Sequence, residues 1–242
     1  MKKVLIVPDT HAPYEDKKAW ALMIRAAKVF KPDSVVLLGD FADFYSVSSH
    51  SKDPNRANQM DKEVAHTIKL LKELKTLKAK EYVFIAGNHE NRLERYLQDS
   101  APELHNLISI PKLLQLKELG FHYVPYKQFY KIGKLHLTHD VDNAGRYAFF
   151  KALDVFQRNI VCGHTHRIGY AVEGNAEGKK HVTATFGWLG DINEVDYMKK
   201  VKLNKDWTLG FGLAYIEPNG NARLVPVPIV DYTALIEGKL VK

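Results

Sequence analysis

Short apolar runs that end in polar residues recur along the first two thirds of the chain. Residues 4–7 form an unbroken apolar run bounded by Pro8, and this pattern predicts a buried β-strand. The same reasoning predicts four further strands, at 34–38, 82–86, 134–138 and 159–162.

Amphipathic stretches lie between these strands. Trp20, Ile24, Ala27 and Phe30 recur at helical spacing, and Pro32 follows them, so we expect a helix that ends before the proline. The alternation of strands and helices predicts an α/β first half with parallel strands. The expected helices are 15–31, 60–79 and 144–157, with a further helical stretch, 90–118, that is interrupted at Pro102 and Pro111.

The last third of the chain is rich in predicted strands. Residues 181–186 form one, and residues 213–217 and 222–227 flank Pro218-Asn219-Gly220, a turn signal typical of a hairpin. No repeat, low-complexity tract or linker-like stretch divides the sequence. We therefore predict a single domain that spans residues 1–242.

Composition narrows the class of protein. Hydrophobic residues make up 45% of the 242 residues, enough for a sizeable core and a globular enzyme. Cys162 is the only cysteine, so an intramolecular disulfide and a multi-cysteine zinc module are excluded, and a reducing compartment is the simplest interpretation. The apolar run after Lys2 and Lys3 is too short for a signal peptide or a membrane span. We expect a soluble, cytoplasmic protein with no membrane partner.

The chain carries a formal charge of +7 and has a pI of about 9.2. A basic balance favours polyanionic partners such as nucleic acid. The alternative is that the protein is mildly basic without such a partner, and the lysine-rich stretch 69–80 is expected to be the solvated face of a helix.

Polar residues able to bind metals follow the carboxyl ends of five predicted strands. Ligand sites of open α/β sheets gather outside these strand ends, so we expect the side chains to meet at one edge. The residues are Asp9 and His11, Asp40, Asn88 and His89, His139, and His164 and His166.

These donor types indicate which metals the site suits. Carboxylate, imidazole and carboxamide donors without a thiolate favour borderline or hard divalent ions. The set is too large for one tetrahedral zinc ion and suits two ions that share a bridging carboxylate. In each of the pairs Asp9/His11 and His164/His166, the two residues are two positions apart, so in an extended segment they lie on one face.

Five sequence blocks together resemble the calcineurin-like metallophosphoesterase superfamily, in matching order between residues 9 and 166. The stretches 43–56 and 92–96 also resemble small phosphoesterases of bacteria and their phages. The resemblance implies an α/β fold, a four-layer sandwich of two mixed β-sheets flanked by helices. The blocks are Asp9-x-His11, Gly39-Asp40-x-x-Asp43, Gly87-Asn88-His89-Glu90, His139 and Gly163-His164-x-His166.

The resemblance also implies two divalent metal ions and a role for each matching residue. Manganese is the expected metal, with iron, zinc and nickel as alternatives. His89 would be the catalytic histidine beside the leaving group, and Asp43 would orient it by accepting its other N–H. The implied ligands are Asp9, His11 and His166 for the first ion, Asn88, His139 and His164 for the second, and Asp40 as the bridge between them.

Several residues admit two interpretations. Asn88, Arg92 and Arg95 are candidates for holding substrate phosphate, and for the two arginines a solvated helix surface is an equal alternative. Trp188 and Trp207 are expected in the core rather than on a surface that stacks on substrate. The remaining histidines lack a motif context: His136 is expected to pack within its strand, and His50 is expected at the surface or in the core, although it lies in the loop after Asp43.

The expected activity is hydrolysis of a phosphodiester of DNA, RNA or a nucleotide, which includes the activity of a nuclease. A hydroxide that bridges the two ions would attack phosphorus, and His89 would assist the leaving group. Phe44 stands where protein phosphatases of this superfamily carry an arginine, which argues against protein phosphatase activity. The alternatives are a phosphomonoesterase, a dinucleotide polyphosphate hydrolase, and a metal-dependent binding scaffold without catalysis. The oligomeric state is left open.

Overall fold

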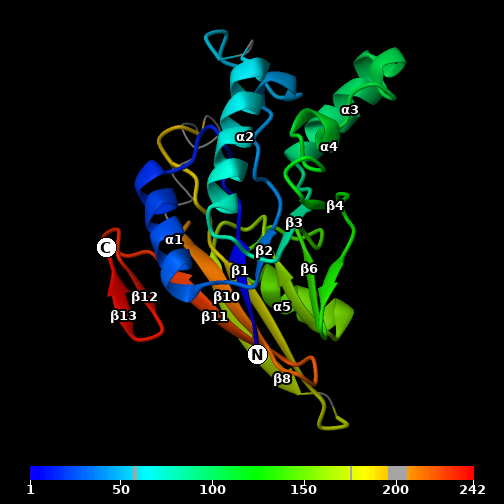
Figure 1. Cartoon of the computed structure of the whole chain (residues 1–242). Coiled ribbons are helices and arrows are strands. Elements are labelled where there is room, and N and C mark those ends of the chain that lie inside the picture. The colour runs from blue at the N-terminus through cyan, green and yellow to red at the C-terminus, as the bar shows by residue number, and fades with distance from the viewer. Residues whose placement is uncertain (57–58, 175, 196–205) are drawn as a thin grey trace.

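Two mixed β-sheets lie face to face at the centre of the protein, and helices cover their outer faces (Figure 1). The structure is a computed structural model that describes residues 1–56, 59–174, 176–195 and 206–242. Within these ranges, no helix combines the length and the hydrophobicity that a membrane span requires.

The first sheet has six strands in the order β11-β10-β1-β2-β3-β4. Its four N-terminal strands are parallel, and Val7, Leu37 and Phe84 lie in register near their carboxyl ends. The loops that follow β1, β2 and β3 therefore leave the sheet at one edge. The strands are β1 (Lys2–Val7), β2 (Ser34–Leu37), β3 (Glu81–Ile85), β4 (His122–Val124), β10 (Gly210–Ile216) and β11 (Ala222–Pro228).

The second sheet has five strands in the order β5-β6-β7-β9-β8. Strands β6 and β7 are parallel, with Thr138 opposite Cys162, so the residues that follow both strands also leave at a common edge. The strands are β5 (Tyr130–Ile132), β6 (Leu135–Thr138), β7 (Asn159–Cys162), β8 (Ile168–Gly174) and β9 (Lys180–Phe186). A separate hairpin of β12 (Ala234–Ile236) and β13 (Lys239–Val241) packs against α1.

The helices begin and end where the sequence provides the local signals. Helix α1 starts after Asp16, whose carboxylate accepts hydrogen bonds from the backbone N–H groups of Lys18 and Ala19, and it ends at Lys31 in a left-handed conformation before Pro32. The helices are α1 (Lys17–Phe30), α2 (Met60–Lys75), α3 (Glu90–Ser100), α4 (Ile110–Leu113) and α5 (Ala148–Phe156), with 3₁₀ turns at Tyr45–Val47 and Pro102–Leu104.

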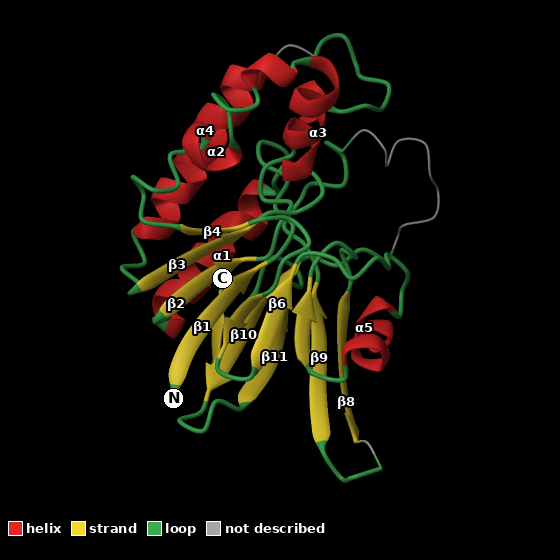
Figure 2. Cartoon of the chain, turned by 90° about the vertical axis from the view of Figure 1, so that its right-hand side faces the viewer, coloured by secondary structure: helices red, strands yellow, loops and turns green. Residues whose placement is uncertain are grey.

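Alternate residues of the first sheet supply two different apolar cores. Ile6 and Val36 face the second sheet and pack in one cluster with Phe186. Leu5 faces the opposite way and packs in a second cluster with Phe30 of α1. Helix α5 covers the outer face of the second sheet against β7, β8 and β9 (Figure 2). The layers are helix, sheet, sheet and helix, which confirms the predicted four-layer α/β sandwich.

The predicted elements are present, with differences in their extent. The helix expected at 60–79 ends at Lys75, and the stretch expected at 90–118 is α-helical only over α3 and α4. The break after α3 coincides with Pro102, whose ring cannot continue a helix. The helix expected at 144–157 begins at Ala148. Strands β4, β5, β8, β12 and β13 were not predicted; four of them are only three residues long, and much of β8 is exposed.

Candidate active site

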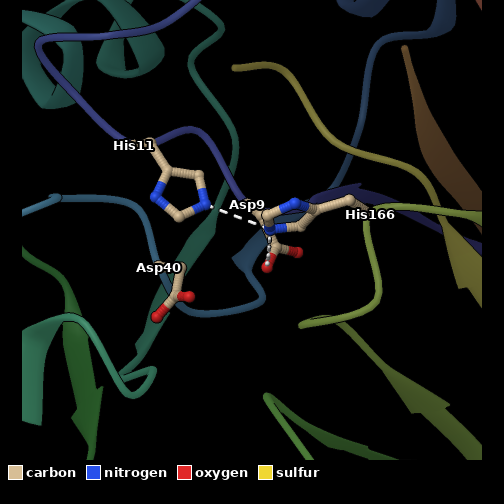
Figure 3. Close-up of side chains that lie close together, drawn as sticks. All are labelled: Asp9, His11, Asp40 and His166. Carbon is tan, nitrogen blue, oxygen red and sulfur yellow. Dashed lines mark hydrogen bonds and ion pairs between the residues drawn. The ribbon is translucent and has the colours of Figure 1, made fainter. Parts of the chain in front are cut away.

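Loops after β1, β2 and β7 bring four buried side chains together above the edge of the two sheets (Figure 3). Nε2 of His11 lies 3.1 Å from Nε2 of His166. The same atom of His166 lies 3.3 Å from Oδ1 of Asp9. Asp40 completes this group, in which one donor atom of each residue lies within 4.8 Å of the others.

A second group of donors adjoins the first and shares Asp40 with it. It consists of Asp40, His139 and His164. Nε2 of His139 lies 3.3 Å from Oδ2 of Asp40 and 2.9 Å from Oδ1 of Asn88. Nδ1 of His139 donates to the carbonyl of Leu38 at 2.9 Å, which leaves Nε2 as the atom that faces the group. Asp9, His11 and His166 thus lie in the first group, His139 and His164 lie in the second, and Asp40 is common to both.

The charge states of these residues fit divalent cations. Burial lowers the pKa of His11 to about 4, and burial also lowers the pKa of His164 and His166, so these three imidazoles are neutral. Burial opposes ionisation of Asp9, but His166 holds the pKa of that carboxyl below its ordinary value. Neutral imidazoles and ionised carboxylates are the forms that bind metal. The facing Nε2 atoms of His11 and His166 present at most one proton between them, so at least one lone pair points into the group.

His139 differs from the other histidines of the site. Burial alone would lower its pKa, but the carboxylates of Asp40 and Asp9 raise it to about 10. In the absence of a metal ion, a protonated His139 therefore balances part of the charge of these carboxylates. A bound cation would take over this role, because metal binding displaces protons from its ligands.

Three glycines make room for the donors. A Cβ added to Gly87 would lie 2.2 Å from Oδ1 of Asp40, and one added to Gly39 would lie 2.4 Å from Nδ1 of His139. A Cβ added to Gly163 would lie 2.8 Å from Oδ2 of Asp9. The glycine that precedes Asp40, Asn88 and His164 in each block is therefore required by the close approach of a neighbouring donor.

The backbone at the site is strained. His11, Asp40, His164 and His166 all have left-handed conformations, with φ between 47° and 66°. Such conformations are uncommon for residues other than glycine, and they cluster at functional sites where the surrounding structure enforces them. Here the tight turns direct each side chain back over the ends of the sheets.

Glu90 ties two of these loops together from beneath. Its Oε2 accepts hydrogen bonds from the backbone N–H groups of Asp40 at 3.0 Å and Gly87 at 2.7 Å. Its Oε1 accepts from Ala42 at 2.8 Å. Burial and the nearby Asp40 raise the pKa of Glu90 to about 7, while the three donors favour the ionised form. The last residue of the block Gly87-Asn88-His89-Glu90 therefore positions the loops rather than facing the cleft.

Asp43 lies between two histidines and an arginine. Its Oδ2 is 3.1 Å from Nδ1 of His89 and 3.1 Å from Nδ1 of His11. Arg92 donates through Nη1 to Oδ1 and to the backbone carbonyl of Asp43, both at 2.9 Å. Burial opposes the charge, but His89 and the hydrogen bonds hold the pKa of Asp43 well below its usual range. Asp43 thus lies within hydrogen-bond distance of His89, and its role in orienting that histidine stays a prediction. Phe44, next in the chain, is buried in the core.

A cleft of about 390 Å³ lies over the two groups. Of the two arginines considered for binding phosphate, Arg92 lines this cleft, whereas Arg95 lines a neighbouring hollow of about 270 Å³. Arg167 also lines the cleft, and sequence reasoning missed it, although it directly follows His166. The cleft is lined by Asp40, His50, Asn88, His89, Arg92, Ala144, His164, Thr165, His166, Arg167 and Trp207.

Two tryptophans back His166. Trp188 is buried and stacks on the His166 ring, with ring centroids 4.8 Å apart and an interplanar angle of 13°. Trp207 meets the same ring edge-on, with centroids 4.1 Å apart, and lines the cleft. The expectation of a core position is confirmed for Trp188 and is wrong for Trp207. Sequence pattern alone could not show this, because the position of Trp207 depends on its packing against Trp188 and His166. His136, by contrast, packs against Phe129 away from the cleft.

Comparison with known proteins gives the family of the chain and several relatives. A family model described as calcineurin-like phosphoesterase matches residues 2–207. The gene 54 protein of Mycobacterium phage D29 is 27% identical over 252 residues, covering 98% of this chain and 97% of the relative. The gene 54 protein of Mycobacterium phage L5 is 25% identical over 261 residues, covering 99% and 98%. Among solved structures, Vacuolar Protein Sorting 29 from Cryptosporidium parvum is similar with a TM-score of 0.47 and 17% identity, covering 100% of this chain and 95% of that one.

Proposed function

Because the chain belongs to the calcineurin-like phosphoesterase family, we propose that it is a phosphodiesterase that acts on nucleic acid or nucleotides with two divalent ions, Mn²⁺ first among them. The family and the two donor groups that share Asp40 indicate a dinuclear metal-dependent phosphoric ester hydrolase. The choice of Mn²⁺ is supported by carboxylate, imidazole and carboxamide donors without a thiolate. We also propose a cytoplasmic location, supported by the lone buried thiol of Cys162, which suits a reducing compartment.

One observation carries the preference for a diester over a monoester. Two arginines line the described part of the cleft, and each is already paired with a carboxylate. Arg92 binds Asp43 at 2.9 Å, and Arg167 binds Asp206 at 2.9 Å. A diester carries one negative charge and a monoester up to two, so the second charge of a monoester would compete with Asp43 or Asp206 for its partner.

The residues of the cleft suit a reaction in which the leaving oxygen needs a proton. The bound ions would supply Lewis acidity, which neutralises phosphate charge and acidifies water. Nδ1 of His89 is held by Asp43, so the other ring nitrogen, Nε2, faces away from that carboxylate. Burial disfavours a charged His89, but Asp40 and Asp43 raise its pKa above the ordinary value. Nη2 of Arg92 lies 3.0 Å from Nε2, and once it has moved away His89 is suited to donate a proton from that atom to the leaving group.

Asp40 also orients His89 through the backbone. Its Oδ1 accepts a hydrogen bond from the His89 N–H at 2.8 Å, while Oδ2 faces His139. One carboxylate thus links the position of the proposed general acid to the shared donor of the metal groups. Asn88, between Gly87 and His89, points its Oδ1 at Nε2 of His139, as suits a second-ion ligand or a contact to phosphate.

A phosphomonoesterase is the second candidate, and Arg92 favours it. Arg92 supplies from α3 the guanidinium that position 44 lacks, and if it left Asp43 it could hold a dianionic phosphate. The deciding experiment is hydrolysis of a bis-aryl phosphodiester and of the matching aryl monoester by Mn²⁺-loaded protein. Diester turnover that is lost in His89→Ala supports the proposal, and preference for the monoester contradicts it. No turnover of either substrate, with the ions still bound, would favour a binding scaffold.

A further inference from the structure

A cationic hollow adjoins the cleft on the side of α3, and Arg92 lines both. We call it the side hollow; its walls are the loop after the 3₁₀ turn Tyr45–Val47 and one face of α3. Its volume is about 270 Å³. Its lining includes Lys52, Arg92, Arg95, Tyr96 and Asp99.

The side hollow begins at the proposed catalytic histidine. Nη2 of Arg92 lies 3.0 Å from Nε2 of His89, and the same guanidinium forms part of the wall of the side hollow. A substrate whose scissile phosphate lies beside His89 therefore meets the side hollow as its next contact in this direction. Because Arg92, Arg95, Tyr96 and Asp99 recur three or four residues apart on α3, they share one helix face.

The side hollow carries more positive than negative charge. Arg92 is paired with Asp43, but in the described parts of the chain neither Arg95 nor Lys52 forms an ion pair with a carboxylate. The only hydrogen bond of the Lys52 ammonium there goes to the carbonyl of Ser46 at 2.9 Å. Asp99 is the single acidic residue among the described residues of the lining. Two cations without an acidic partner in a concave surface are suited to an anion with several oxygens.

An aromatic ring lies in the same wall. Tyr96 is 44% exposed, which is a large fraction for an aromatic side chain that borders a concave surface. Cations that follow a phosphate backbone, together with an aromatic face on which a base stacks, are the combination that binds single-stranded nucleic acid. The net charge of +7 favours the same class of ligand.

We propose that the side hollow binds the nucleotide next to the scissile phosphodiester, so that the substrate is a single-stranded polynucleotide rather than an isolated diester. This inference rests on the proposed function and specifies its substrate. Arg95 and Lys52 hold the adjoining phosphate, and the base stacks on Tyr96. Arg92 lies between the two phosphates.

The test compares a polynucleotide with a small diester. Lys52→Ala/Arg95→Ala and Tyr96→Ala are assayed with labelled oligothymidylate and oligouridylate of equal length and with a bis-aryl phosphodiester. The ratio of kcat/KM for the oligonucleotide to that for the small diester should fall roughly 5-fold or more for Tyr96→Ala, the lower end of the loss of one stacked base. Preference between the two oligonucleotides separates DNA from RNA. The matched controls are Arg25→Ala on α1 and Tyr170→Ala on β8, and both should leave the ratio unchanged. The Tyr170 side chain is 49% exposed, close to the value for Tyr96.

Binding is measured separately, so that the inference does not depend on turnover. In a His89→Ala background, fluorescence anisotropy gives the affinity for the same oligonucleotides as a function of salt. Each lost phosphate contact should reduce the slope of log affinity against log salt by about 0.7 for a single strand. An unchanged slope and affinity in the double variant, or an equal loss on both substrate types, would overturn the side hollow as a nucleotide site. Absence of any hydrolysis by the unmutated protein would instead refute the proposed function, and the binding data would still decide the inference.

Discussion

Nη2 of Arg92 lies 3.0 Å from Nε2 of His89, and both side chains contact the carboxylate of Asp43. A guanidinium has no acceptor, so in this arrangement Nε2 of His89 accepts and its proton is on Nδ1, toward Asp43. Arg92 therefore fixes the ring of His89 from the side opposite to Asp43. It must release Nε2 before that atom can carry a proton to a leaving group.

This relationship predicts a loss of turnover in Arg92→Ala. We expect kcat to fall roughly 10–100-fold, the usual effect of removing a partner that orients a functional side chain. Arg92→Lys should recover part of the loss, because an ammonium keeps the charge but not the fork that binds Asp43 twice. Steady-state kinetics on a diester, with metal content measured in parallel, test this. Unchanged kcat, or loss of the ions, would show that Arg92 does not act through His89.

Asp40 is the donor shared by the two groups, so its removal should affect both ions. Asp40→Ala is expected to retain fewer ions than His164→Ala, which should keep about one ion at the Asp9 group. His89→Ala is the control and should keep both ions while losing turnover. Metal content after gel filtration, measured by elemental analysis, gives the answer. Equal metal content in Asp40→Ala and His164→Ala would contradict the shared role.

The sequence predicted the edge of the sheets where the site lies because each strand there is an apolar run with a polar residue within two positions of its end. Parallel register then brings the residues after Val7, Leu37 and Ile85 together. The grouping of the donors could be predicted from the sequence for the same reason, although their roles as ligands are still predictions. The sequence could not show that Arg92 lines the cleft and Arg95 only the neighbouring hollow, since helical spacing places both on one face of α3.

Other features depend on contacts between distant segments. The position of Trp207 in the wall of the cleft follows from its packing on His166, and the role of Glu90 follows from three backbone N–H groups on two loops. Neither leaves a periodic signal in the sequence. The short strands β4 and β5 were missed because three residues carry too little pattern to distinguish a strand from a loop.

The surroundings of Glu81 predict that this residue contributes to stability in a pH-dependent way, independently of the active site. Its carboxylate accepts hydrogen bonds from Lys2, Ser34 and Tyr130, each at 2.7 Å, and Tyr130 lies in the other sheet. Burial opposes the charge, but these donors lower the pKa of Glu81 from 4.5 to about 2. The ionised form is therefore the one stabilised by folding. Its contribution is fully present above pH 4.5 and is lost as the pH falls toward 2.

Glu81→Gln should consequently lower the free energy of unfolding at pH 7 by no more than about 1 kcal/mol, since solvent weakens partly exposed ion pairs. The difference from the unmutated protein should shrink at a pH between 2 and 4.5. Urea unfolding at the two pH values measures both, with the exposed Glu118→Gln as control. A difference that is constant with pH would mean that the hydrogen bonds do not favour the charged form.

The three hydrogen bonds of Glu90 predict that its carboxylate holds the loops of the site without contacting substrate. Glu90→Gln keeps the size of the side chain but turns an amide N–H₂ toward at least one of the backbone donors of Gly87, Asp40 and Ala42. A buried donor left facing a donor costs about 1–3 kcal/mol. We expect the free energy of unfolding of the metal-free protein at pH 8 to fall by this amount, and metal affinity to fall with it because the Asp40 loop loses its anchor. Urea unfolding with and without Mn²⁺ measures both effects.

The control is Glu94→Gln, on the same helix but half-exposed, which should change the free energy of unfolding by less than about 0.5 kcal/mol. If Glu90→Gln matched this control in both measurements, the loops would be held by their own turns and the carboxylate would be dispensable.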